Sequence, residues 1–410
     1  MQSFVVFIDS AFWTCEPNLV SCSMIYRYLI ENGHSITYDP TQADYIIINT
    51  CGFSRNNEEK SCNLFQKYYA LKKKSATIIM FGCLVRIDEN RLMSLDVVPI
   101  GHNDTTTLDQ IFCRTNQFNT IQPYCDESTK RMLLIGKQPY KFAESIPFLF
   151  SKLFIPFIKR MRINYDRMVR HVKYIDRTFI VIGTGCIGDC SYCVIKKAKG
   201  NLRSRSIEEI EANIRNIHFR TKNIFLVAED CGCYGVDIKT NLFELLYNIH
   251  NTFPEASLDL NNVNPQWLEK QSEEYIKLFE DITIDFALIP LQSGSHKIIK
   301  QMNRHYDPEI VVKIIDRIKK ESPKTLMYTH FIVGFPGEST LDFLKTVAAV
   351  RHFDYPIPFK YSSNKGAASS RLPQQKSNVV ISLRYALLMA VINIVIFSKL
   401  ITIPPDDEKC

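Results

Sequence analysis

Short apolar runs rich in β-branched residues alternate with helical patterns in the first part of the chain. Residues 3–9, 44–50 and 76–82 have the length and composition of buried strands. Residues 23–33 have the spacing of a helix, and a second helix follows the middle strand and runs to Lys74. Strands that alternate with helices in this way predict a three-layer α/β domain around a parallel sheet. Ligands of such sheets bind beyond the carboxyl ends of the strands.

A second alternating series begins near residue 178. Its strand candidates are residues 179–183, 224–228, 257–261, 285–291, 327–333 and 358–361. Helical patterns lie between them, for example over residues 207–219, 242–253 and 310–320. Six such units predict a partial (β/α)6 barrel rather than a closed eight-fold barrel.

These patterns divide the chain into four parts. We expect an N-terminal α/β domain over residues 1–123 and a linker or insert over residues 124–177. The barrel core is expected over residues 178–373, and a C-terminal helical tail over residues 374–410.

Two apolar stretches resemble membrane segments. Residues 148–158 are too short to span a bilayer, and Pro156 interrupts them. Within residues 379–403, only 14 uncharged residues separate Arg384 from Lys399, whereas a transmembrane helix needs about 20. We interpret this stretch as a buried C-terminal helix and expect no stable membrane insertion. The N-terminal residues do not have the pattern of a signal peptide, so we expect a cytoplasmic protein.

Composition and charge exclude some classes of protein without selecting one. The 410 residues are 46% hydrophobic and 23% charged, which argues against a disordered chain, and 15 glycines exclude a collagen-like one. Lys and Arg total 50 against 43 Asp and Glu, and the resulting charge of +7 permits a nucleic-acid partner but does not require one. The 13 cysteines are informative through their spacing.

Three cysteines directly follow the first strand of the second series. Cys186, Cys190 and Cys193 form a C-x3-C-x2-C motif on a single loop. Three thiolates on such a loop can bind three irons of a [4Fe–4S] cluster and leave the fourth iron open. A structural zinc site would instead use four protein ligands. The motif therefore predicts a cluster that activates a small molecule.

Three further cysteines follow strands of the N-terminal series. Cys51 and Cys83 lie just past two predicted strands, and Cys15 follows the first strand by a few residues. Because these positions share one edge of a parallel sheet, the three thiols could meet there.

Longer motifs around these cysteines resemble the radical S-adenosylmethionine methylthiotransferases of the MiaB/RimO type. The resemblance runs in the family's order over roughly residues 3–373. It is carried by residues 14–20, 43–51, 81–84, 185–196, 198–205, 288–295, 300–304 and 332–338. The first of these motifs is the least similar, because a glycine usually precedes the cysteine that corresponds to Cys15.

This resemblance implies a transferase with two [4Fe–4S] clusters and S-adenosyl-L-methionine as cofactors. Cys186, Cys190 and Cys193 would hold the cluster that binds S-adenosylmethionine and cleaves it to a 5′-deoxyadenosyl radical. Cys15, Cys51 and Cys83 would hold a second cluster that carries the sulfur. The product would bear a methylthio group at a carbon that previously carried hydrogen. The electron donor would be a flavodoxin or a ferredoxin.

The resemblance also suggests roles for residues that follow barrel strands. Tyr192 would pack on the adenine, and Gly334 lies in the strand end that would line the adenine pocket. Glu229 and Asp230 would contact the amino group or the ribose, and Gln292 and Ser293 would lie near the methionine part. Cys231 and Cys233 follow a barrel strand as well, but the sequence assigns them no role.

The substrate is the least determined part of this interpretation. Family members usually end in a small β-barrel RNA-binding domain called TRAM, and the residues after 373 show no pattern for it. The missing pattern disfavours a tRNA base and makes a peptide or protein side chain a candidate, so the expected macromolecular substrate is one of these two. An alternative is a radical enzyme that forms a thioether or carbon–carbon bond in a peptide without methylthiolation, and the three N-terminal cysteines disfavour it. A non-catalytic iron–sulfur or RNA-binding protein is a further alternative, disfavoured by the complete barrel motifs.

Overall fold

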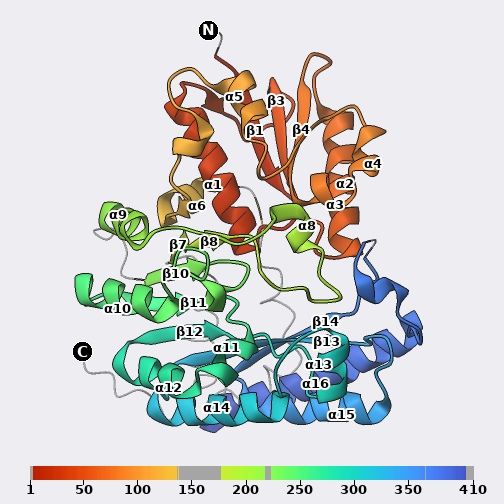
Figure 1. Ribbon diagram of the computed structural model, residues 1–410. Helices are drawn as coiled ribbons and strands as arrows, with labels where there is room; N and C mark the ends of the chain where they lie inside the picture. Colours follow the sequence, from red (N-terminus) through yellow and green to blue (C-terminus); the bar gives the residue numbers. More distant parts are fainter. Residues whose placement is uncertain (1–2, 136, 138–176, 218–222, 365, 403–410) are drawn as a thin grey trace.

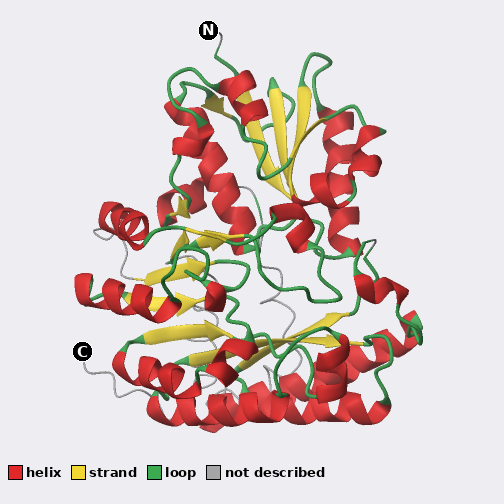
Figure 2. Ribbon diagram, viewed as in Figure 1, coloured by secondary structure: helices red, strands yellow, loops and turns green. Residues whose placement is uncertain are grey.

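The computed structural model describes residues 3–135, 137, 177–217, 223–364 and 366–402. The apolar stretch at residues 148–158 and most of the expected linker lie outside these residues. The described residues form two large sheets, one above the other in Figure 1, with helices around each, and a two-stranded antiparallel sheet. Figure 2 shows the two groups of strands and the helices that cover them.

The N-terminal sheet has five parallel strands in the order β2-β1-β3-β4-β5. The strands are β1 (Val5–Ser10), β2 (Ser35–Ile36), β3 (Tyr45–Thr50), β4 (Thr77–Gly82) and β5 (Val98–Ile100). Alternate strand residues pack on opposite faces, Ile47 and Ile79 on one and Ile46 and Ile78 on the other. The predicted three-layer domain is confirmed.

Each face of this sheet is covered by helices. One face packs on α1 (Glu16–Glu31), α5 (Thr106–Phe112) and the short helix η1 (Phe118–Thr120). The other packs on α2 (Arg55–Leu71), α3 (Cys83–Ile87) and α4 (Glu89–Met93). The first helix begins seven residues before the predicted start, because Pro17 occupies its first turn, where a missing N–H costs no hydrogen bond.

The second sheet has seven strands in the order β14-β13-β12-β11-β10-β7-β6. Six are parallel and form the predicted partial barrel: β7 (Thr178–Val181), β10 (Asn223–Val227), β11 (Ser257–Leu260), β12 (Ile284–Leu288), β13 (Leu326–Val333) and β14 (Tyr355–Lys360). The edge strand β6 (Tyr124–Cys125) runs antiparallel to β7. The first residues of the expected linker or insert form β6 and α6 (Glu127–Leu133), which pack on the folded body.

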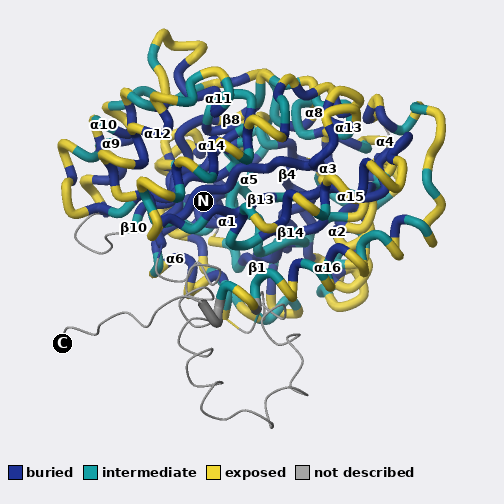
Figure 3. Tube along the Cα trace, turned by 90° about the horizontal axis from the view of Figure 1, so that it is seen from below, coloured by how far each residue is buried: buried dark blue, intermediate teal, exposed yellow. Residues whose placement is uncertain are grey.

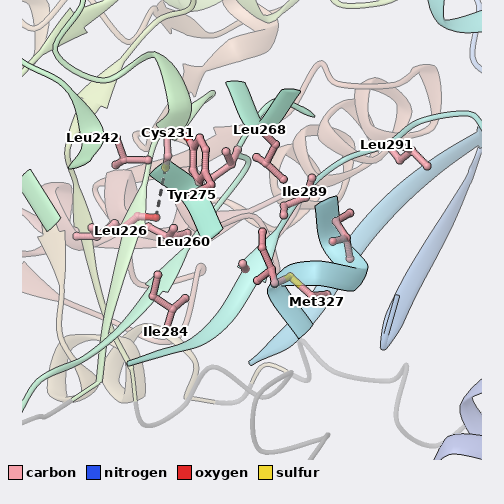
Figure 4. Packing of buried hydrophobic residues seen from close by; sticks show 14 of the residues in the cluster. Leu226, Cys231, Leu242, Leu260, Leu268, Tyr275, Ile284, Ile289, Leu291 and Met327 are labelled. Atoms are coloured by element: carbon pink, nitrogen blue, oxygen red, sulfur yellow. Dashed lines mark hydrogen bonds between the residues drawn. The ribbon is translucent and has the colours of Figure 1, made fainter. Parts of the chain in front are cut away.

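Helices and short strands connect the barrel strands. They are β8 (Gly183–Thr184), α8 (Ile195–Lys199), β9 (Arg203–Ser204), α9 (Ile207–Ile217), η4 (Cys231–Cys233), α10 (Leu242–Thr252), α11 (Pro265–Lys270), α12 (Ser272–Asp281), α13 (His296–Gln301), α14 (Pro308–Glu321), α15 (Thr340–Ala349), η5 (Val350–His352), η6 (Ala368–Arg371) and α16 (Asn378–Thr402). The helical layer and the strands enclose the largest apolar core, which includes Leu226, Leu260 and Met327 (Figure 4).

The C-terminal helix α16 lies along the barrel edge at β14 (Figure 1). Among the α16 residues whose exposure is described, Ile381, Leu388 and Ile392 are buried, at spacings that form one stripe along the helix. Val379 and Ile394 are 77% and 68% exposed, and Figure 3 shows α16 largely exposed or intermediate. The expectation of a buried helix was thus wrong for most of α16, because a helix lying on a barrel edge can bury only one side.

Within the described residues, α16 also contains a segment long and apolar enough to cross a membrane. It is Asn378–Ile396, with a mean hydropathy of 2.3 and 17% of its residues buried. This finding rests on length and composition alone.

A hydrogen-bond network at the start of α15 fixes the loop that follows β12. The Asp342 carboxylate accepts hydrogen bonds from the Ser339 N–H and hydroxyl and from Ser295 Oγ at 2.7 Å. Burial alone would raise the pKa of Asp342, but hydrogen bonds from Ser339, Ser295 and Lys297 outweigh it and hold the pKa below its usual 3.8.

We predict that Asp342→Ala lowers the free energy of unfolding by about 2 kcal/mol, because it removes a helix cap and leaves the buried Ser295 hydroxyl without its acceptor. Since the folded-state pKa is depressed, the wild type should lose this contribution as the pH falls below about 4. Urea unfolding at several pH values measures both effects. Glu321→Ala, at an exposed helix end, should change little, and equal losses in the two variants would contradict the prediction.

Candidate active site

The barrel cysteines lie on the loop between β8 and α8, as the sequence predicts. Backbone N–H groups point at two of the sulfurs: Gly188 donates to Cys186 Sγ at 3.2 Å and Ile195 to Cys193 Sγ at 3.4 Å. The Arg304 guanidinium donates to Cys190 Sγ at 3.8 Å. Donors around the sulfurs are the environment in which a protein stabilises thiolates and iron–sulfur clusters.

Gly185 makes this loop possible. Its backbone has φ +77°, and a Cβ atom at this position would lie 2.1 Å from the backbone oxygen of Asn201. Gly200, at the end of α8, has a similar φ of +81°, but a Cβ atom there would meet nothing within 4 Å. Of these two glycines, Gly185 alone combines the left-handed conformation with a close approach of two backbone segments.

The N-terminal cysteines come from three separate loops at the carboxyl edge of their sheet. Cys15 immediately precedes α1, Cys51 follows β3, and Cys83 begins α3 directly after β4. Burial raises the pKa of the Cys15 thiol, and the charge of Cys51 raises it further. Burial also raises the pKa of Cys83 to about 12, and Cys51 again adds to the rise. The charge of Cys51 thus acts on the pKa of both other thiols, and a shared site for the three stays a prediction.

Other side chains contact these N-terminal thiols. Asn57 Nδ2 donates to Cys51 Sγ at 3.5 Å, and His102 Nε2 lies 3.3 Å from Cys83 Sγ. Burial lowers the pKa of His102 to about 3, with a further contribution from Lys199, so this imidazole is neutral at pH 7. The sequence reasoning missed both residues, because neither shares a motif with a cysteine and only the fold brings them together.

The two groups of cysteines face each other across the domain boundary. Helices α3 and α8 pack together there, through Cys83, Ile87, Val194 and Ala198 (Figure 1). The charge of Cys193 is among the influences that raise the pKa of Cys83. Among the residues that the structure describes, no three Cys, His, Asp or Glu side chains form a site for a single metal ion. The thiols of an iron–sulfur cluster bind separate irons, so they need not meet at one point.

A buried ion pair lies between these groups of cysteines. The Lys199 ammonium at the end of α8 binds Glu229 Oε1, just after β10, and the two side chains are 10% and 11% exposed. The pair lines a cavity of about 190 Å³ between the domains, together with His102, Phe81 and Val227. The sequence placed Lys199 inside a motif without assigning it a role, and Glu229 was predicted to contact the cofactor.

Tyr192 and Asp230 have hydrogen-bond partners within the protein. Arg304 donates to the Tyr192 hydroxyl at 2.9 Å and to Asn264 Oδ1 at 2.8 Å. Asp230 accepts from the N–H groups of Gly232 and Asn264 and from Trp267 Nε1, each at 3.0 Å. Asp230 therefore holds the strand-end loops together. Arg304 was contained in a motif, but no role had been assigned to it.

The hydrogen-bonding groups of three other predicted site residues, Gln292, Ser293 and Gly334, are paired to different extents within the protein. Gln292 has φ +63°, and its buried Oε1 accepts no hydrogen bond from the described residues. Ser293 is fully buried, with its Oγ 3.2 Å from Thr346 Oγ1 in α15. Gly334 donates its N–H to Glu338 at 2.8 Å, and a Cβ atom there would lie 2.5 Å from Ile381 of α16.

Cys231 and Cys233 belong to the barrel core. Both are fully buried, and Cys231 Sγ lies 3.7 Å from the Leu226 oxygen, as Figure 4 shows beside Tyr275. Cys233 Sγ lies 3.1 Å from the Asp230 oxygen. Burial raises the pKa of both thiols, so at neutral pH they are protonated core residues.

Known protein families match both the barrel and the N-terminal domain. Residues 180–350 match the radical SAM superfamily, and residues 8–99 match the uncharacterised protein family UPF0004. The chain is 28% identical over 391 residues to a tRNA-2-methylthio-N(6)-dimethylallyladenosine synthase of Clostridium botulinum, covering 93% of this chain and 80% of that protein. It is 29% identical over 383 residues to a ribosomal protein uS12 methylthiotransferase RimO of Clostridium novyi, covering 92% and 79%.

Solved structures share the fold. The radical S-adenosylmethionine methyltransferase TsrM from Kitasatospora setae matches with a TM-score of 0.54 at 12% identity, covering 88% of this chain and 75% of that one. The cobalamin-dependent S-adenosylmethionine radical enzyme OxsB matches with a TM-score of 0.52 at 11% identity, covering 96% and 56%.

The matched families lie in the order expected from the motifs, and the curated relatives match over most of the chain. Radical S-adenosylmethionine methylthiotransferases use S-adenosyl-L-methionine and two [4Fe–4S] clusters. The chain thus combines a radical SAM domain with a UPF0004 domain and is similar over most of its length to enzymes named as radical S-adenosylmethionine methylthiotransferases.

Proposed function

We propose that this enzyme inserts a methylthio group at a C–H bond of a macromolecule and binds two [4Fe–4S] clusters to do so. One cluster is held by Cys186, Cys190 and Cys193, and the other by Cys15, Cys51 and Cys83. The observation that carries the proposal is the position of these two groups of thiols, each at the carboxyl edge of a parallel sheet and facing the other. Each group offers three thiolates, which leaves one iron of each cluster open.

The residues present fit two clusters. Burial raises the pKa of Cys186 to about 11 and of Cys193 to about 12, and it also raises that of Cys51. Thiols with a raised pKa lose their protons when a metal binds, because metal ligation requires the thiolate. Hydrogen-bond donors surround the sulfurs at the barrel site, where they are the N–H groups of Gly188 and Ile195. At the N-terminal site, Asn57 supplies a donor and Lys199 a positive charge.

The bound cofactors supply the radical chemistry and the methylthio group, and the protein positions them. Tyr192, oriented by Arg304, is proposed to contact the adenine. The unpartnered Oε1 of Gln292 is the acceptor available for the methionine part. The strand end at Gly334 lines the adenine site, while Asp230 and Ser293 hold the surrounding loops in place.

The names of the relatives indicate a macromolecular substrate. One relative is named for a tRNA nucleoside and another for ribosomal protein uS12, so we propose a tRNA base or a protein side chain. A flavodoxin or ferredoxin as reductant and a cytoplasmic location stay predictions.

We predict about eight irons per chain after anaerobic reconstitution, and about four in a Cys15→Ala/Cys51→Ala/Cys83→Ala variant, because one of two four-iron clusters is lost. Iron and sulfide analysis measures this. The control Cys62→Ala/Cys113→Ala removes thiols from the same domain outside the proposed site and should retain about eight irons. About four irons in both the wild type and the triple variant would refute the second cluster.

Gly185 provides an independent test of the barrel cluster. Gly185→Ala should lower the iron content to about four, because the added Cβ atom collides with the Asn201 backbone and displaces the loop. Gly200→Ala has the same left-handed strain without the collision, so it should keep about eight irons. Similar iron contents for these two variants would show that the close approach does not control cluster binding.

A further inference from the structure

Lys199 links the barrel to the N-terminal thiols. It is the last residue of α8, the short helix that follows the barrel cysteine loop. The neighbouring helix α3 begins with Cys83, and the Lys197 ammonium of α8 donates to the Ile87 oxygen of α3 at 2.9 Å. This docking fixes the end of α8 beside the N-terminal domain. The Lys199 side chain is 10% exposed, so its charge acts in a medium that screens it weakly.

The charge of Lys199 reaches thiols from three different loops. Burial raises the pKa of Cys15, Cys51 and Cys83, and in each case the Lys199 charge opposes that rise. Burial would lower the pKa of Lys199 itself, but Glu229 and Cys83 outweigh it and keep the pKa above its usual value. Lys199 is paired with Glu229 and lines the same cavity as His102, whose Nε2 contacts Cys83 Sγ, so the barrel places a cation beside the thiol group of the other domain.

Glu229 moderates this charge. Its Oε1 binds Lys199, whereas its Oε2 is buried and accepts no hydrogen bond from the described residues. Asp230, the next residue, is held by Gly232, Asn264 and Trp267, so the strand end that carries Glu229 is fixed. The N-terminal thiols thus face an ion pair whose cation and anion have fixed positions.

A cluster with three thiolate ligands becomes more negative when it takes up an electron. The reduction potential of such a cluster depends on nearby charge, on hydrogen bonds to its sulfurs and on its exposure. A buried cation stabilises the reduced state more than the oxidised state and raises the potential, and a buried anion has the opposite effect.

We propose that Lys199 and Glu229 together set the reduction potential of the cluster on Cys15, Cys51 and Cys83. The positive charge of Lys199 raises this potential, and the negative charge of Glu229 lowers it. This inference rests on the proposed function, because it requires a cluster on these cysteines. It assigns Glu229 to the N-terminal cluster rather than to S-adenosylmethionine.

The test is an EPR-monitored redox titration of the full chain. A Cys186→Ala/Cys190→Ala/Cys193→Ala parent isolates the signal of the N-terminal cluster. In this parent, Lys199→Met should shift the midpoint potential downward, since methionine keeps the apolar stem and removes the charge. Lys199→Arg should stay close to the parent, and Glu229→Gln should shift the potential upward. The control is Lys196→Met. Lys196 lies on the same helix but pairs with the exposed Asp189, so its loss should cause no shift of the potential.

The outcomes separate the two proposals. A parent without a cluster would overturn the proposed function and this inference with it. If the parent holds its cluster and the Lys199→Met and Glu229→Gln variants have the same midpoint potential as the parent, this inference alone is overturned. If Lys199→Met cannot hold a cluster, Glu229→Gln decides: an upward shift supports the proposal, and an unchanged potential overturns it.

Discussion

The packing of two parallel sheets with their carboxyl edges facing each other is the constraint on which the site depends. Residues that follow parallel strands gather at one edge of the sheet, so the N-terminal domain collects three thiols there from three loops. The barrel carries its three thiols on the single loop between β8 and α8. The contact between α3 and α8 then brings the two edges together through Cys83, Val194 and Ala198. A short helix that follows one cysteine loop therefore packs on a short helix that begins with a cysteine of the other group.

A shared apolar core fixes the two domains relative to each other. Leu19 and Ile25 of α1 belong to the same cluster as Phe179, Phe225 and Phe286, which line the inner face of the barrel strands. Because α1 starts directly after Cys15, the packing that joins the domains also positions one thiol. Protein interiors of this kind are close-packed and deform little, which suits a site that depends on residues from both domains.

Many strand-end residues in this barrel stabilise the loops rather than face open space. Asp230 joins the loops after β10 and β11, and Ser293 and Asp342 anchor the loop after β12 to α15. Glu338 pairs with Arg384 of α16 and accepts from the Gly334 N–H. Buried polar groups of this kind are stabilising only when they are paired, and these contacts pair Asp230, Ser293 and Asp342 within the protein.

The sequence by itself determined two α/β units, the C-x3-C-x2-C loop and the position of three further cysteines at strand ends. It could do so because hydrophobic periodicity and residue spacing are local properties of the chain. It did not reveal β6, whose two residues pair only through the tertiary fold, or the one-sided burial of α16. Nor could it show that Lys199 meets Glu229 or that Arg304 orients Tyr192. These contacts join residues from separate loops, and only the packing of the chain decides which side chains share a buried space.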